Sequence, residues 1–469
     1  MSGPDARTRI ARAATLVLVL VLWFSPVPAG LTAPAWRLFA LFIGAIVAVI
    51  VSALPILTAS ILAVGAAVLS GTLAPAKAYS GFANGTILLI VVAFLVARAV
   101  VKSGLGQRLG YLVVSLFGRS TLGLGYSIFL VDAVIAPAFP SNTARSGVLF
   151  PILYSLAQAG GSKPEDGTAR RMGSFLMFCG MASLSLSSAL WLTAMAANPI
   201  GAELAEKFGV RISFGSWLVA ASLPTVVAIL LLPLLIYKVF PPEVKSTPEA
   251  PALARASLKT LGPLSRHEKI VMVTFLGMVL LWAFAATLKL DSTAVAFVGL
   301  GVLLATEVLT LKDISQEGDV LATFIWFAVL FTLSGQLNEL GFMGFLGERL
   351  ASALGGIPWP GVYLILVVAY VLMHYLFVSQ TAQSLALFGV FLEVGIKLGV
   401  PAAPLAFLLL FATNFFSAIT PQGSSANVIF AGSGYLTQGE LYRLGALTTL
   451  FNLFVFLVVG TPWLLFVTR

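Results

Sequence analysis

Long apolar stretches alternate with short polar ones along nearly the whole chain of 469 residues. Many approach the roughly 20 residues that a helix needs to cross the hydrocarbon core of a bilayer. Lipid offers no hydrogen bonds to a peptide backbone, so spans of this kind have to be helical. The pattern predicts an all-α polytopic membrane protein, with apolar stretches at 13–29, 35–52, 55–73, 86–103, 121–138, 144–158, 173–196, 214–238, 270–287, 293–310, 321–337, 361–378, 382–399, 402–419 and 443–467.

Two pairs of these stretches are short, and a polar element interrupts each pair. The residues at the two interruptions are similar: SNTARSGVLFPI begins at Ser141, and SQTAQSLALFGV begins at Ser379. Paired, interrupted segments in corresponding places of two halves are typical of the substrate site of a secondary transporter. We therefore predict two re-entrant helical hairpins, at about 121–158 and 361–399, that belong to inverted repeats.

One long polar stretch, at 241–269, divides the chain nearly in half. It contains prolines and charges without an apolar period, so we expect a cytoplasmic loop there and not a folded domain. This division gives a first inverted repeat at 1–240, a linker at 241–269 and a second inverted repeat at 270–469.

Composition supports the membrane assignment, and the distribution of charge suggests a topology. Hydrophobic residues make up 59% of the chain and charged residues only 10%, against about 25% in soluble proteins. If the hairpins do not cross and the N-terminus is cytoplasmic, about eleven helices cross, and inward loops carry more than twice as many Lys and Arg as outward loops. We expect a multi-pass protein of the bacterial inner (plasma) membrane. The basic residues form no single face, so we expect no nucleic-acid partner.

Each hairpin interruption places polar side chains at the start of a half-helix. The first backbone N–H groups of a helix lack partners and its dipole makes this end positive, which favours a bound anion. Hydroxyl and amide side chains can donate to a carboxylate, and two opposed tips would hold a small anion with carboxylates at both ends. Ordinary helix capping is the alternative. The candidate substrate ligands are Ser141, Asn142, Thr143, Ser379, Gln380 and Thr381.

Two ionisable residues stand close to the tips. Arg145 near the midplane costs at least about 2.5–3.5 kcal/mol, so it needs either an anionic substrate or a structural partner such as Asp132. His374 precedes the second tip and either contacts substrate or packs as a ring that is hydrogen-bonded to backbone. Four acidic residues are either proton relays or structural partners near helix ends: Asp132, Glu307, Glu339 and Glu393.

A further polar interruption follows each hairpin, LTAMAANP at 192–199 and ITPQGSSANVIF at 419–430. Small residues and proline favour unwound backbone and close approach. We expect these breaks to line the same cavity, with Asn198 and Ser424 facing the substrate; simple helix kinks are the alternative.

At these motifs the sequence resembles the divalent anion/sodium symporter (DASS) family, in particular its citrate/succinate and plant 2-oxoglutarate/malate exchangers. The resemblance covers essentially the whole chain. It implies eleven transmembrane helices, two re-entrant hairpins, a homodimer and an elevator motion of the hairpin-bearing part. The motifs that carry it are PSNTAR (140–145), LTAMAANP (192–199), HYLFVSQTAQSLALFGVF (374–391) and GSGYLT (432–437).

The resemblance also implies roles for individual residues. Gln380 stands where the family has a second Asn, and the sodium-coupled relatives carry a hydroxyl residue at the positions of Pro137 and Tyr375. Because neither residue suits a tight cation cage, we expect no bound sodium. The resemblance assigns substrate carboxylates to Ser141, Asn142, Thr143, Ser379 and Thr381, and it matches Gly423, Ser424 and Asn427 to small, hydroxyl and Asn positions of the second break.

The sequence thus predicts an antiporter of di- and tricarboxylates such as 2-oxoglutarate, malate, succinate or citrate. In this hypothesis Arg145 replaces sodium as counter-charge, with His374 as a second candidate. The alternative transporter is a Na⁺- or H⁺-coupled symporter, and an anion channel is a further alternative function. Enzyme motifs such as HExxH or a nucleophile elbow are missing from the sequence, so we expect no enzyme and no cofactor. Membrane lipid is the other expected partner.

Overall fold

The computed structural model describes residues 6–377 and 379–469, which form helices connected by turns. Within these ranges, eight helical segments are long and apolar enough to cross a membrane. The prediction of an all-α membrane protein is therefore confirmed, while the number of crossings stays a prediction. These segments are α2 (Ala33–Ile50), α5 (Gly85–Ser103), α7 with the turn after it (Thr121–Ala138), α9 (Gly173–Leu190), α11 (Phe214–Val239), α17 (Gly318–Glu339), α19 with the turn after it (Trp359–Leu376), and α23 with the π-turn and α24 that follow (Gln438–Val467).

The helices group into two compact units, each built from segments of both halves of the chain. The units are groups of packed helices and not sequence repeats, so the inverted repeats at 1–240 and 270–469 stay a prediction. The first unit comprises the described residues up to Val91 together with 200–211 and 317–409, and the second comprises 92–199, 212–316 and 410–469.

The first unit contains α1 (Ala6–Phe24), α2 (Ala33–Ile50), α3 (Ile56–Leu69), α4 (Pro75–Ala78), α17 (Gly318–Glu339), α18 (Phe342–Ala353), α19 (Trp359–Met373) and α20 (Gln380–Lys397). The second contains α6 (Leu105–Phe117), α7 (Thr121–Ile135), α8 (Asn142–Ala159), α9 (Gly173–Leu190), α11 (Phe214–Val239), α12 (Ala250–Leu261), α13 (Arg266–Ala283), α14 (Ala285–Leu288), α15 (Ser292–Ala305), α16 (Leu311–Ser315), α22 (Ser425–Ala431), α23 (Gln438–Val455) and α24 (Thr461–Val467). Residues of α5 (Gly85–Ser103), α10 (Ala197–Glu206) and α21 (Ala402–Phe415) belong to both.

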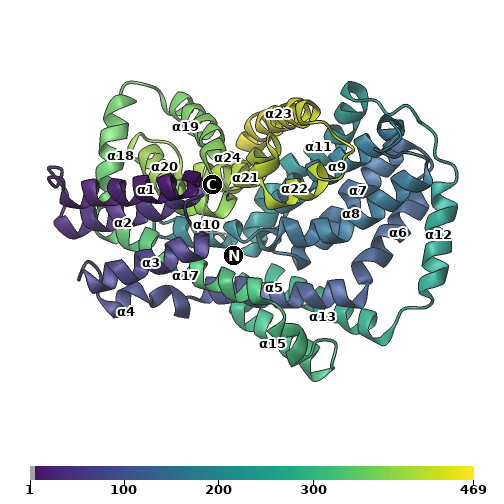
Figure 1. Cartoon of the computed structure of the whole chain (residues 1–469), viewed down its shortest axis with the longest axis horizontal. Coiled ribbons are helices and arrows are strands. Elements are labelled where there is room, and N and C mark those ends of the chain that lie inside the picture. The colour runs from purple at the N-terminus through teal and green to yellow at the C-terminus, as the bar shows by residue number, and fades with distance from the viewer. Residues whose placement is uncertain (1–5, 378) are drawn as a thin grey trace. The chain divides into compact units, whose positions relative to one another are not determined.

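In the first unit, α1, α2 and α3 lie side by side, and α17 packs against α2 and α3 (Figure 1). A close contact joins α17 to the turn before α5: the backbone N–H of Gly81 donates to Thr332 Oγ1 at 2.9 Å. A Cβ atom on Gly81 would come within 2.2 Å of the carbonyl oxygen of Ala328. Only glycine fits so close to a neighbouring backbone.

Helix α9 is the centre of the second unit, where it packs against α7, α8 and α11. It is buried on all sides, as expected for a helix without a polar face. Its serines do not contradict this, because their hydroxyl groups can bond to carbonyls one turn earlier. Ser183 donates to Gly180 O at 3.0 Å, and Ser185 donates to Ala182 O at 2.7 Å.

The two predicted hairpins have the same helix–turn–helix form. The first consists of α7, a 3₁₀ turn at Ala136–Ala138 and α8; the second consists of α19, a 3₁₀ turn at His374–Leu376 and α20. Both arms of each hairpin lie within one unit.

The linker at 241–269 is not the plain loop that we expected, because it contains α12, which packs along α6. The side of α12 that is buried carries alanines, Ala250 and Ala254. Alanine favours a helix but contributes little to an apolar period, which is why the sequence pattern missed this helix.

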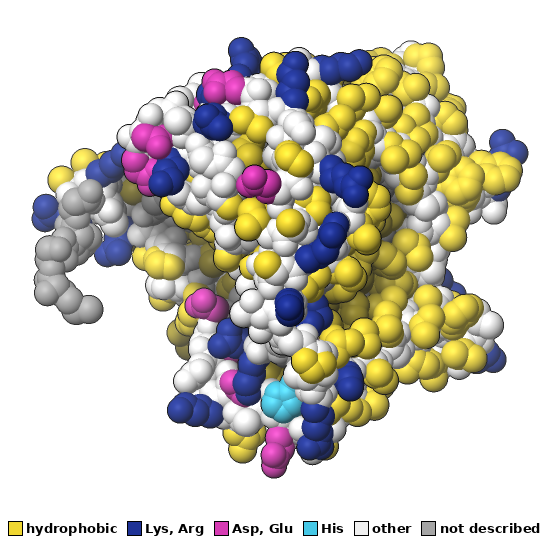
Figure 2. Space-filling view, turned by 90° about the vertical axis from the view of Figure 1, so that its right-hand side faces the viewer, with side chains coloured by type: hydrophobic (Ala, Val, Ile, Leu, Met, Phe, Trp, Pro, Cys, Tyr) yellow, Lys and Arg dark blue, Asp and Glu magenta, His cyan; other side chains and the backbone are white. Residues whose placement is uncertain are grey.

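Exposed hydrophobic side chains are abundant, as expected for a protein whose surround is lipid. On the face drawn in Figure 2 they form a continuous area along one side, and the acidic side chains lie outside it.

The end of the linker is fixed by an ion pair, which gives a prediction for pH. Arg108 Nε donates to Glu268 Oε1 at 2.5 Å, and Arg108 Nη1 donates to Gly262 O at 2.9 Å. Burial raises the pKa of Glu268, but hydrogen bonds from Arg108 and from Ser265 outweigh it and hold the pKa below its ordinary value of 4.5. The stability that this carboxylate contributes is therefore present above pH 4.5 and is lost as pH falls through the lower, folded-state pKa.

We predict that Glu268→Gln lowers the stability of the purified protein by about 1–3 kcal/mol at pH 7, because it removes charged hydrogen bonds. The variant should also lose less stability than the wild type on acidification below pH 4.5. Thermal unfolding in detergent between pH 3 and pH 7 measures both effects; parallel pH profiles for the two proteins would contradict this role.

Candidate functional site

A serine caps the second helix of each hairpin at its tip. The Ser141 hydroxyl accepts from the Ala144 N–H at 3.3 Å, and the Ser379 hydroxyl accepts from the Ala382 N–H at 3.2 Å. Both serines have extended backbone, as N-cap residues do. Each hydroxyl that accepts from the backbone keeps its own hydrogen for another acceptor.

The tip of the second hairpin borders an open groove of about 430 Å³ in the first unit. Ser379, Ser52 and Trp326 are among the residues in its walls. This volume lies in the usual range for small-molecule sites, about 300–1,000 Å³. The Ser379 tip is therefore open to a small ligand.

Arg145 does not stand free as the counter-charge that we expected. Its side chain is fully buried, and Nη1 lies 3.4 Å from Oδ1 of Asp132, which is also fully buried. Nη1 also donates to Ser187 Oγ at 2.6 Å, and Nη2 donates to Ser188 Oγ. A buried cation needs such partners, and with Asp132 ionised the pair carries no net charge. The structural alternative for Arg145 thus fits the geometry.

The same network orients Asn142. Its Oδ1 accepts from Arg145 Nη2 and, at 2.6 Å, from Ser188 Oγ. Because an arginine can only donate, the amide oxygen must face it, and this settles which way the amide points. No hydrogen bond of the Asn142 Nδ2 group is found among the described residues. Arg145 thus fixes the amide oxygen of Asn142 and leaves its two amide hydrogens on the opposite side.

The two helix breaks are closed in the same way, each by one asparagine. Asn198 Nδ2 donates to the carbonyls of Ser188 (2.9 Å) and Trp191 (3.1 Å), which lie 10 and 7 residues earlier. Asn427 Nδ2 donates to Ser417 O at 2.8 Å and Thr420 O at 3.0 Å, at the same two separations. These bonds supply donors to carbonyl groups that have no hydrogen-bond partner where a helix is interrupted.

The remaining hydrogen-bonding capacity of Asn198 is also engaged. Its Oδ1 accepts from Asn414 Nδ2 at 2.9 Å, and the residue is fully buried. These bonds give Asn198 a structural role. Its amide group has no free donor for the substrate contact that we expected.

The second break approaches the tip of the first hairpin within the second unit. Thr143 Oγ1 and Ser425 Oγ are 2.5 Å apart, and both residues are exposed. Ser424, which we predicted, is buried and caps α22 through a bond from the Ala426 N–H at 3.4 Å. At Gly423 a Cβ atom would lie 2.5 Å from Ser417 O, so glycine is required for the close turn.

His374 lies inside the second hairpin and is fully buried. Its Nδ1 lies 2.8 Å from Gln383 Oε1, and Gln383 Nε2 donates to Tyr370 O at 2.8 Å. Because Oε1 must accept, His374 carries its proton on Nδ1. This supports the packed-ring alternative, with a side-chain partner. Gln380 and Thr381, in the first turn of α20, are also buried.

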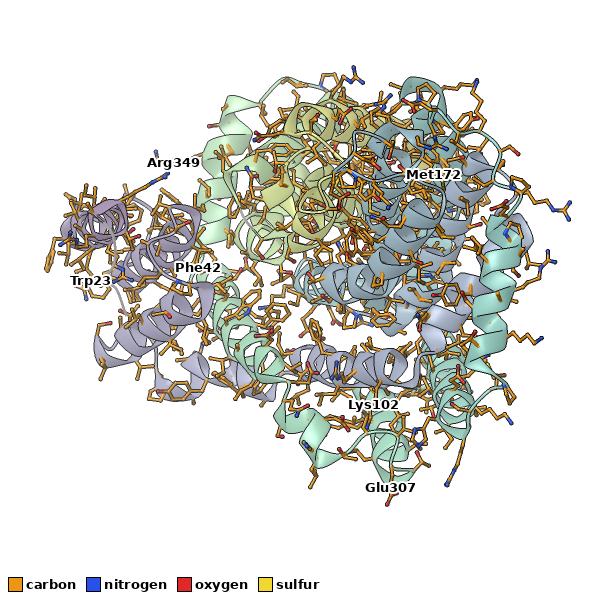
Figure 3. All side chains as sticks on the ribbon, turned by 45° about the vertical axis from the view of Figure 1, so that its right-hand side comes forward. Trp23, Phe42, Lys102, Met172, Glu307 and Arg349 are labelled. Atoms are coloured by element: carbon orange, nitrogen blue, oxygen red, sulfur yellow. The ribbon has the colours of Figure 1, made fainter. Side chains whose placement is uncertain are left out.

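The acidic residues occupy structural positions. Glu339 ends α17 and pairs with Lys77 at 3.0 Å, and Glu393 lies 3.4 Å from Lys397. Glu307 is exposed at the turn after α15, with its side chain pointing outward (Figure 3). With Asp132 paired to Arg145, each of the four has the structural or helix-end position that we weighed against a proton relay.

Sequence reasoning missed several residues of this site. Ser187 and Ser188 belong to a run of serines, SLSLSS, in the most deeply buried helix, and such a run signals polar partners. Asn414 lies within an apolar stretch, and Ser425 was passed over beside Ser424. Single buried amides and hydroxyls inside apolar helices are the signal that would have found them.

Capped half-helices and breaks inside apolar helices define the class: an α-helical membrane transporter with discontinuous helices at its site. The family model described as "Sodium:sulfate symporter transmembrane region" matches residues 7–468, and the chain belongs to this family, the divalent anion/sodium symporters. The protein is a multi-pass membrane transporter and not an enzyme.

The chain is similar to several named transporters over almost its full length. YflS of Bacillus subtilis, provisionally named a malate transporter, is 41% identical to this chain. The match covers 96% of this chain and 94% of YflS. Dicarboxylate transporter 1, chloroplastic, of Arabidopsis thaliana is 40% identical (97% of this chain, 82% of the relative). The L-tartrate/succinate antiporter of Shigella sonnei is 32% identical (96% and 97%).

A solved structure shares the fold. MtrF of Neisseria gonorrhoeae, described as illuminating a class of antimetabolite efflux pumps, superimposes with a TM-score of 0.61 at 14% identity, over 96% of this chain and 97% of that chain. At this identity the likeness concerns the fold alone.

The buried pair gives a stability prediction. Arg145→Met should destabilise the protein by about 3–5 kcal/mol, because it leaves Asp132 buried and unpaired. The double variant Asp132→Leu/Arg145→Met should recover most of that loss. Thermal unfolding in detergent measures both, with Lys77→Ala as control, whose exposed pair is worth at most about 1 kcal/mol. A double variant no better than the single one would contradict the pairing.

Proposed function

We propose that the protein is a secondary transporter of di- and tricarboxylates, of the 2-oxoglutarate, malate, succinate and citrate class, that exchanges one anion for another. The observation that carries this is the repeated tip: two hairpins, each with a serine-capped helix start. The names of the relatives, dicarboxylate transporter and tartrate/succinate antiporter, support the same substrate class.

Each tip supplies neutral donors and a positive helix end for one carboxylate. A helix start carries roughly +0.5 of an elementary charge, and backbone N–H groups there bind anions. At the first tip the ligands are the hydroxyls of Ser141 and Thr143 and the amide of Asn142; Gly423 and Ser424 shape the adjacent break. At the second tip the corresponding ligands are Ser379, Gln380 and Thr381.

Exchange without sodium is supported by Pro137 and Tyr375, which occupy the two positions where sodium-coupled relatives have a hydroxyl residue. Pro137 has no side-chain oxygen, and its carbonyl accepts from Thr193 Oγ1 at 2.9 Å. Tyr375 packs its ring against His374, with centroids 5.6 Å apart. Neither offers a small hydroxyl to a cation. Symport with Na⁺ or H⁺ is the alternative.

Obligate exchange then follows from the helix ends and not from Arg145. A tip without an anion leaves a positive end and several donors unsatisfied in a medium of low polarity, which costs free energy. The empty site therefore returns slowly, and a second anion speeds its return. We further propose an elevator motion, a homodimer and a location in the bacterial inner membrane with the N-terminus in the cytoplasm.

The transport experiment uses the purified protein in liposomes and labelled 2-oxoglutarate. We predict uptake into vesicles loaded with unlabelled malate, at least tenfold faster than into empty vesicles, and no change with a Na⁺ gradient. Uptake into empty vesicles that requires Na⁺ would establish the symporter instead, and uptake into empty vesicles without any gradient would indicate a channel.

The tips give a second prediction for the same assay. Ser141→Ala and Ser379→Ala should each raise KM for 2-oxoglutarate by about tenfold, because each removes a hydrogen bond to a charged group worth about 1.5 kcal/mol or more. Ser115→Ala, which alters a half-buried serine of α6 whose hydroxyl donates to Leu112 O, is the control. Unchanged KM values in both tip variants would contradict the assignment.

A further inference from the structure

A groove runs between α1, α2 and α3 in the first unit, and it shares Leu54 with the groove beside Ser379. Its volume is about 320 Å³. Its walls are apolar and include Leu16, Val19, Leu41, Ala45, Leu62 and Ala66. Figure 1 shows the three helices stacked side by side, with α2 between the other two.

Small residues create this groove. Ala59, Ala63 and Ala66 recur along one face of α3 and line it. On α2 the wall contains Gly44, where a Cβ atom would lie 2.2 Å from Val19 Cγ2. The helices therefore meet closely at Gly44, while the alanines of α3 leave the groove unfilled.

Arg12 stands in the wall of the groove and is held in place. Its Nε donates to the carbonyl oxygen of Ala53, in the turn between α2 and α3, at 3.0 Å. The residue is exposed, and no acidic partner of Arg12 is found among the described residues. Its two terminal amino groups are thus presented as a fork, the geometry that binds phosphate with two parallel hydrogen bonds.

The groove fits within one leaflet of a bilayer. On α2 the lining runs from Leu41 to Ala48, about 11 Å at the helical rise of about 1.5 Å per residue. Half of the hydrocarbon core is about 15 Å. Arg12 lies at the end where the lining reaches Ala53, and Arg7 and Arg9 occur on the same part of α1. Anionic lipids of the cytoplasmic leaflet attract such basic segments.

We propose that this groove binds an anionic phospholipid, with one acyl chain against the alanines of α3 and the phosphate on the Arg12 guanidinium. The apolar wall accounts for the chain, and the anchored arginine selects a negative headgroup. This groove adjoins the one beside Ser379 at Leu54, but its other wall residues are different.

Lipid titration of the purified full-length protein, followed by native mass spectrometry, tests the proposal. The probes are dioleoyl-phosphatidylglycerol and dioleoyl-phosphatidylcholine, which differ in headgroup charge and share their chains. The wild type should prefer phosphatidylglycerol. Arg12→Ala should lower its affinity by about fivefold, the effect expected for one arginine at an anionic surface. Phosphatidylcholine, which carries the same phosphate but no net charge, should lose less affinity.

Matched variants separate the headgroup from the chain. Arg9→Ala removes the same charge from an exposed position outside the groove wall and should have less effect. Ala66→Trp fills the groove and should weaken both lipids, whereas Ala66→Ser leaves room and should not. Equal losses in Arg9→Ala and Arg12→Ala would overturn the site, and so would lipid binding unchanged by Ala66→Trp.

Two other occupants of the groove would give different results in this experiment, and either result would contradict the proposal. If a free anion occupies Arg12, inorganic phosphate displaces phosphatidylglycerol, and Ala66→Trp does not matter. If a second copy of the chain covers the groove, Ala66→Trp shifts the measured mass of the assembly toward monomer.

Discussion

An unpaired backbone group has no partner in lipid, so a helix can break inside an apolar protein only where side chains take the place of the missing turn. Asn198 and Asn427 do this for the two breaks, each bonding carbonyls 10 and 7 residues before it. Ser141 and Ser379 do it for the starts of the two hairpin helices. These four side chains close the breaks, and the helix starts beside them remain available to an anion.

The charges near the first tip follow from the same constraint. Asp132 and Arg145 are sealed from solvent and form a pair, so Arg145 brings no free positive charge to a ligand. Its influence passes through Asn142, whose amide oxygen it engages. In the function that we propose, the positive potential that attracts a carboxylate comes from the helix start itself and from N–H and O–H donors.

Local pattern revealed the hairpins, the breaks and the polar tips, because each depends on residues close together in the chain. The partners of Arg145 were beyond such reasoning, since Ser187 and Ser188 stand more than 40 residues away on another helix. Helix α12 was not predicted because alanines form its buried side and give no clear apolar period. Asn198 was predicted to face the substrate; its amide bonds instead to the backbone of its own break.

Binding of succinate to the purified protein, followed by calorimetry, tests most directly the claim that neutral donors at helix starts hold the carboxylates. Two variants are compared with the wild type: Asn142→Leu, and the double variant Asp132→Leu/Arg145→Met. The account predicts that Asn142→Leu weakens binding more than the double variant does. Binding that survives in Asn142→Leu but is abolished in the double variant would show that the charge of Arg145 holds the anion.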